Sequence, residues 1–144
     1  MTEISTNIGG SLEIKNNPEM VYRHFEILSF EILAPASCLC PLDIRAKSNP
    51  PRILSNASIS YFISISPNRS DPGWIMSGTR NLSFTNSMVD IRERGAAWDA
   101  AKGLHGFNGF FLLGDGSTHK VNSKRAQEMA KAQSSSNVIA IPND

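Results

Sequence analysis

The stretch from Ile53 to Ser66 has the sequence I-L-S-N-A-S-I-S-Y-F-I-S-I-S and predicts the central strand of the fold. From residue 57 onward apolar and polar residues alternate, and a period of two places alternate residues on opposite faces of a strand. β-branched and aromatic residues suit a pleated, half-buried surface. One face carries Ala57, Ile59, Tyr61, Ile63 and Ile65, and the other carries Ser58, Ser60, Ser64 and Ser66. We therefore expect one long strand, apolar toward the core and serine-rich on its other face.

Phe62 breaks this alternation, because it lies among the serines of the polar face. A phenylalanine exposed to water there is costly unless a partner covers it. A flat, serine-rich strand is also a surface that another sheet or a partner chain can cover. The position of Phe62 thus predicts a binding surface on the central strand.

The segments after the central strand predict an α+β fold. A turn over residues 67–73 and a strand over 74–84, interrupted by Gly78, indicate an antiparallel pair. The remaining expected elements are helix 87–104 with Trp98 in the core, strand 107–113, turn 114–117, a helix from Asn122 or Ser123 to about residue 133, and strand 138–141. The predicted architecture is an antiparallel sheet of four to six strands with the two helices packed on one face.

The N-terminal third gives a weaker pattern. Residues 1–10 are polar and predict a mobile arm, followed by a single domain over 11–144 that begins with a short strand at 11–15. Asn17 before Pro18 can begin a helix through about residue 28, whereas the aromatic and β-branched residues of 22–33 favour a strand. We favour the strand. The prolines of segment 34–51 predict a loop with at most a short edge strand at Leu39–Arg45.

Charge and composition restrict the setting of the chain. The 144 residues have a formal net charge of +1, but residues 45–80 carry five basic side chains against one acidic one. There is no basic-then-apolar N-terminal run and no apolar run of bilayer length, so we expect neither a secretory signal nor a membrane partner. Two cysteines in a C-x-C are a poor basis for a disulfide framework. These features favour a reduced, cytoplasmic setting.

Cys38 and Cys40 are candidate metal ligands, with His24, His105 or His119 completing the set. Structural zinc sites use wider spacings, commonly C-x2–4-C, and no histidine pair lies nearby in the sequence. We expect that the two thiols neither bind zinc nor pair with each other, and that the protein needs no cofactor. A cysteine or serine nucleophile with a histidine base stays open, because sequence spacing does not show which side chains converge.

The loop from Gly114 to Lys120 follows an apolar strand and precedes a helix, which is the setting of many anion sites. It matches neither a Walker A loop nor the dinucleotide-binding pattern. Its candidate anion-binding residues are Gly114, Gly116, Ser117 and Lys120.

Together these patterns favour a small non-catalytic binding module with single-stranded nucleic acid as its leading ligand. Phe62 would stack on a base, while Arg52, Arg69 and Arg80 would contact phosphates. The alternative is a structural subunit that forms a homo-oligomer or binds a protein partner. A second alternative is a small enzyme that uses the Gly114–Lys120 loop.

Overall fold

The computed structural model describes residues 14–15, 17, 20–27, 35–47, 54–66, 68 and 70–142. The predicted arm, residues 1–10, lies outside these residues. Within the described part of the chain, no helix is both long and apolar enough to cross a lipid bilayer.

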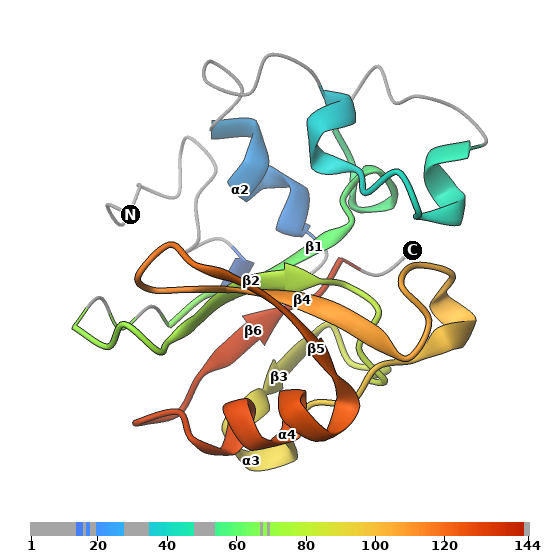
Figure 1. The fold of residues 1–144 in the computed structure, drawn as a ribbon. Coiled ribbons are helices and arrows are strands. Elements are labelled where there is room, and N and C mark those ends of the chain that lie inside the picture. The colour runs from blue at the N-terminus through green and yellow to red at the C-terminus, as the bar shows by residue number, and fades with distance from the viewer. Residues whose placement is uncertain are drawn as a thin grey trace.

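A six-stranded antiparallel sheet forms the centre of the molecule, as the sequence predicted (Figure 1). The order across the sheet is β3-β6-β1-β2-β4-β5, so β1 lies in the interior with β6 and β2 as its neighbours. The strands are β1 (Tyr61–Ser64), β2 (Ile75–Thr79), β3 (Met88–Asp90), β4 (Asn108–Leu113), β5 (Thr118–Asn122) and β6 (Val138–Ala140). The α+β fold class and the antiparallel pairing of β1 with β2 are therefore confirmed.

Helical segments lie on both faces of the sheet (Figure 1). One face packs against α3 (Ile91–Arg94) and α4 (Ser123–Lys131), and we call it the α4 face. The opposite face carries α2 (Val21–Ile27) together with short 3-10 helices, and we call it the α2 face. The 3-10 helices are η4 (Pro35–Cys38), η5 (Ile44–Lys47), η6 (Asn56–Ser58) and, before β4, η7 (Ala100–Lys102).

The main core lies between the sheet and the α4 face helices. Trp98 and Phe111 are buried with ring centroids 5.2 Å apart, so the predicted core position of Trp98 is confirmed. Glycine makes this approach feasible, because a Cβ on Gly109 would stand 2.5 Å from the Trp98 ring. The N-cap of α4 is Asn122, whose side chain accepts from the Arg125 amide, also as predicted.

The long strand expected over Ile53–Ser66 is wrong in its length, because within the described part of this stretch, residues 54–66, only Tyr61–Ser64 is strand. Residues 56–58 form η6 instead, where Ser58 Oγ donates to the Ser55 carbonyl and accepts from the Ser55 amide. Serine side chains that bond nearby backbone in this way compete with strand pairing.

The prediction that one face of this strand is polar and open to solvent is wrong as well, because helices cover both faces of the sheet at β1. Ser58, Ser60 and Ser64 are buried. Ser64 Oγ donates to Asn137 Oδ1 at 2.8 Å and accepts from Trp74 Nε1 at 3.2 Å. Ser64 in β1 and Ser60 just before it thus satisfy distant buried polar groups, whereas Ser66, beyond the strand, is exposed.

The helix expected over 87–104 is also wrong. Strand β3 occupies residues 88–90, and the Asp90 side chain then caps the short helix α3 by accepting from the Arg92 amide. Gly95 ends that helix with φ of +78°, a value that favours glycine. Beyond it, Trp98 forms an isolated antiparallel bridge with Leu82. A capping side chain and a left-handed glycine therefore override the apolar helical spacing.

Two N-terminal expectations also differ from the structure. Tyr22–Ile27 belongs to helix α2 instead of a strand, while residues 28–34 lie outside the described part. The helix places Val21 and Phe25, four residues apart, against Ile63 and Ala140 of the sheet. Ile14 and Lys15 are helical where a strand was expected, whereas segment 39–45 forms turns and the start of η5, in keeping with the predicted loop.

Candidate functional site

A pocket of about 500 Å³ opens on the α2 face of the sheet. Register places Tyr61 beside Thr79 and Ser77 beside Leu112, so the floor of the pocket is a continuous patch of β1, β2, β4 and β5. The lining is mainly apolar and comprises Phe25, Cys40, Tyr61, Ser77, Gly78, Thr79, His105, Phe110, Phe111, Leu112 and Thr118. Concave, largely apolar sites with a few polar groups are typical of small-ligand binding.

Cys40 and His105 meet in the wall of this pocket, with 3.3 Å between Cys40 Sγ and His105 Nε2. Cys40 follows η4 in the N-terminal layer, and His105 lies in the loop between η7 and β4. The His105 ring packs edge-on against Phe110 of the pocket floor, with centroids 4.9 Å apart. The thiol and the imidazole are therefore in direct contact in the wall of the pocket.

A chain of hydrogen bonds holds Cys40 in place. The Cys40 amide donates to Ser60 Oγ at 2.9 Å, and Ser60 Oγ in turn donates to Asp43 Oδ2 at 2.7 Å. The Asp43 amide donates to the Cys40 carbonyl at 2.8 Å. Both backbone polar groups of Cys40 are therefore fixed relative to β1, which leaves its side chain to face the pocket.

Asp43 is fully buried and is paired with two arginines. Arg80 donates to both carboxylate oxygens at 2.9 Å, and Arg45 Nη2 lies 3.1 Å from Oδ2. Burial alone would raise the pKa of Asp43, but hydrogen bonds from Arg80, Arg45 and Ser60 outweigh it and hold that pKa well below its usual range. Asp43 is thus a carboxylate at any physiological pH.

The Arg80 guanidinium also contacts the segment that leads to His105. Its Nη2 donates to the carbonyl of Lys102, at the end of η7, at 3.4 Å. Asn81, the next residue, donates to the carbonyls of Gly106 and Asn108, on either side of Phe107, at 3.3 and 2.8 Å. Neighbouring residues after β2 therefore hold both the Cys40 loop, through Asp43, and the His105 loop.

The electrostatic setting favours an uncharged imidazole. Burial lowers the pKa of His105, and the nearby positive charge of Lys120 lowers it further. Burial raises the pKa of Tyr61, and negative charge at Cys40, Cys38 and Asp43 would add to this effect. Near neutral pH, His105 can accept a proton while the Tyr61 phenol can donate one.

Of the residues predicted to bind nucleic acid, the structure describes Phe62 and Arg80, and neither lies on an open surface. Phe62 is 0% exposed and packs edge-on against Phe111, so its predicted exposure on the central strand is wrong. Arg80 is 7% exposed and is committed to Asp43, so it is not a phosphate contact on an open surface. Arg52 and Arg69 lie outside the described residues. Nucleic-acid binding itself stays a prediction.

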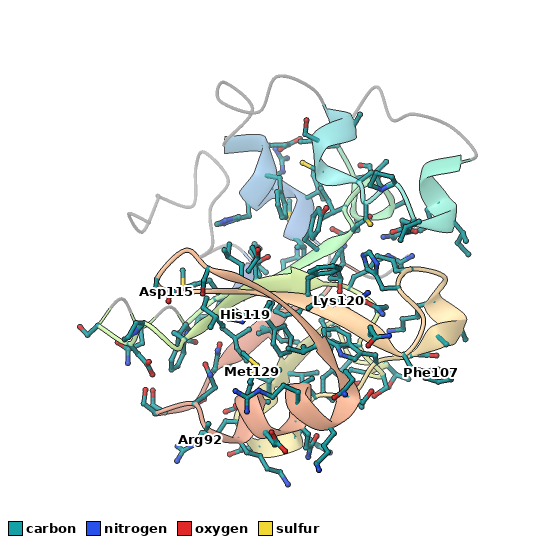
Figure 2. The ribbon with its side chains drawn as sticks, viewed as in Figure 1. Arg92, Phe107, Asp115, His119, Lys120 and Met129 are labelled. Atoms are coloured by element: carbon teal, nitrogen blue, oxygen red, sulfur yellow. The ribbon has the colours of Figure 1, made fainter. Side chains whose placement is uncertain are left out.

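The Gly114–Lys120 segment is a hairpin turn followed by β5, so the prediction that it leads directly into a helix is wrong. Its amides already have acceptors: Gly114 donates to Trp74, Asp115 to Pro72 and Gly116 to Leu113, while the Ser117 amide donates to the Asp115 side chain. Figure 2 shows Asp115, His119 and Lys120 along this hairpin. The turn therefore gives no support to the anion-binding hypothesis.

The metal-ligand candidates do not gather into one site, although Cys40 and His105 contact each other. No cluster of three histidine, cysteine or acidic side chains suited to a metal ion occurs among the described residues. His24 is buried against Phe25 in α2, and His119 contacts Ser117 Oγ at 2.9 Å on the β4–β5 hairpin. Both cysteines are free thiols.

Comparisons with models of protein families, with curated proteins and with solved structures gave no significant match, so function has to be inferred from the geometry. The sequence offered both members of the Cys40–His105 pair among its candidates without joining them. They are 65 residues apart, and no spacing rule links them.

Proposed function

We propose that the protein is a small-ligand binding module whose pocket on the α2 face takes a compact, largely apolar molecule with one polar group. The observation that carries this proposal is the pocket of about 500 Å³, whose largely apolar lining also includes the polar groups of Cys40, His105 and Tyr61. Pockets of roughly 300–1,000 Å³ are of the size that holds small molecules.

The arrangement of the floor suggests how such a ligand is oriented. Phe110 contacts His105, and Leu112 lies two residues further along β4 on the same face. Two residues along a strand span roughly 7 Å. The ligand's polar group would lie beside Cys40, His105 and Tyr61, and its apolar part would lie over Leu112 toward Phe25.

The test is a ligand-observed NMR screen of small aromatic and aliphatic fragments that each carry one carbonyl, hydroxyl or amide group. The informative variant is Leu112→Lys, because Leu112 is 37% exposed and lines the pocket, so a charge enters the site without disturbing the buried core. The matched control is Phe107→Lys, since Phe107 is 72% exposed, lies outside the pocket lining and is marked in Figure 2.

We expect fragments that bind the wild type to bind Leu112→Lys at least tenfold more weakly, a loss of about 1.4 kcal/mol. Phe107→Lys should bind them as the wild type does. If both substitutions weaken fragment binding equally, or if Leu112→Lys does not change it, the fragments bind elsewhere. A screen that finds no binder would also count against the proposal.

A further inference from the structure

We propose that Cys40 is a nucleophile that takes an acyl group from an apolar ester or thioester bound in the pocket, with His105 as its base. The inference rests on the proposed function for delivery of the substrate. The reactivity of the thiol toward a small reagent is separate from that delivery and can be measured by itself.

Three observations carry the inference. Cys40 Sγ and His105 Nε2 are 3.3 Å apart, which is within the range of a hydrogen bond to sulfur and suits direct proton transfer between thiol and imidazole. Both side chains line the same pocket, so a bound carbonyl carbon can reach the sulfur. Tyr61 lines this pocket too, so its hydroxyl is the candidate donor to the oxyanion.

Cys38 provides a comparison for Cys40, because the two thiols lie in different environments. Cys38 is 2% exposed and is absent from the pocket lining, and burial raises the pKa of its thiol. Cys40 is 6% exposed, faces the pocket and has an imidazole partner. Two thiols separated by one residue thus differ in access and in base, which makes Cys38 an internal control.

The reaction balances with these groups alone. His105 Nε2 takes the thiol proton while Sγ attacks the carbonyl carbon, which forms a C–S bond and a tetrahedral oxyanion. Collapse of the oxyanion breaks the bond to the leaving oxygen or sulfur, which departs with the proton from His105. Water then attacks the thioester on Cys40, His105 takes the water's proton, and that proton returns to Sγ as the carboxylic acid leaves. No oxidant or reductant is required.

The first test measures thiol reactivity with iodoacetamide, followed by peptide mass mapping. We expect Cys40 to be alkylated faster than Cys38, Cys38→Ser to keep that rate, and Cys40→Ser to lose it. General base catalysis contributes about 100-fold or more, so His105→Asn should slow alkylation of Cys40 by about 100-fold. Equal labelling of both cysteines, or an unchanged rate in His105→Asn, would overturn the assignment of the base.

The second test uses p-nitrophenyl acetate and p-nitrophenyl hexanoate. A burst of one p-nitrophenolate per chain, with the acyl mass on the peptide that contains Cys40, is the expected result, and it should vanish in Cys40→Ser. Unfolding curves that match the wild type exclude misfolding of the variants. Absence of an acylated Cys40 in the wild type would refute the acyl-transfer inference.

The two proposals can fail separately. If Leu112→Lys weakens fragment binding but Cys40 is unreactive, the binding function is supported and the nucleophile is refuted. If both esters acylate Cys40 equally well and Leu112→Lys has no effect, the nucleophile is supported. The apolar pocket is then refuted as its substrate site.

Discussion

Replacing Arg80 by methionine should destabilise the protein more than any change to an exposed arginine. Asp43 is fully buried and Arg80 is 7% exposed, so the substitution leaves a carboxylate in a low-dielectric interior with one partner fewer. Loss of one partner of a buried ion pair costs about 3–5 kcal/mol, and the remaining contacts from Arg45 favour the lower end, about 3 kcal/mol. The matched control is Arg92→Met at an exposed arginine of α3, marked in Figure 2, which should change stability by about 0.5 kcal/mol or less.

The assay is urea unfolding followed by the fluorescence of Trp74 and Trp98, both of which are buried. Adding Asp43→Asn to Arg80→Met should recover part of the loss, because the double variant no longer buries a carboxylate that has lost one of its two arginine partners. A loss below about 1 kcal/mol in Arg80→Met, or additive losses in the double variant, would refute the claim that this pair is a coupled, buried unit.

The pH dependence of the same variant gives an independent check. The folded-state pKa of Asp43 is depressed, so its stabilising contribution is complete above the unfolded value of roughly 4 and declines as the pH falls toward the folded value. Removing Arg80 raises the folded-state pKa of Asp43. The pH range over which Asp43 loses its stabilising contribution therefore becomes shorter. The difference between the wild type and Arg80→Met should therefore shrink when unfolding is repeated at about pH 3. A difference that stays constant would contradict the electrostatic origin of the loss.

Other changes should have separable effects. Phe62→Ala and Trp98→Ala should each cost about 3–5 kcal/mol in urea unfolding because both rings are buried in the main core, and a loss below 1 kcal/mol would place the ring outside it. Gly95→Ala should cost more than about 1 kcal/mol, since φ is +78° and the new Cβ would stand 2.2 Å from Gln127; a neutral effect on the melting temperature would contradict this backbone geometry. The His105 imidazole should titrate below the ordinary value of about 6.5 in NMR spectra, and Lys120→Met should raise its pKa whereas Lys124→Met should not. If the midpoint of the His105 titration is unchanged in Lys120→Met, burial alone sets this pKa.

Local patterns predicted the parts of the fold that local forces determine. The strands at 75–79, 108–113 and 138–140 lie where apolar and β-branched residues gather between turns, and the Asn122 cap marks the start of α4. These signals are sufficient because hairpin turns and caps act over a few residues. The α+β class follows from the order of such elements.

Long-range contacts decided the features that the sequence analysis missed. Ser60 and Ser64 appear solvent-facing in the sequence, but their hydroxyls bond Asp43 and Asn137, which are 17 and 73 residues away. Phe62 appears exposed for the same reason, since the residues that cover it come from the distant α4 face core. The candidate site is of this kind as well, because Cys40 and His105 belong to opposite halves of the chain.

This division of the chain bears on the order in which the molecule is assembled. Among the described residues, the main core on the α4 face draws its buried side chains from segment 62–141, whereas the smaller core joins Ile14 and Val21 to Ile63 and Ala140. The sheet and its α4 face can therefore condense first, with the N-terminal layer docking afterwards through the Arg80–Asp43 contact. Under this order the thiol and the imidazole meet only in the last step of maturation. A nascent or proteolytically nicked chain would then hold a folded sheet and yet have no reactive pair.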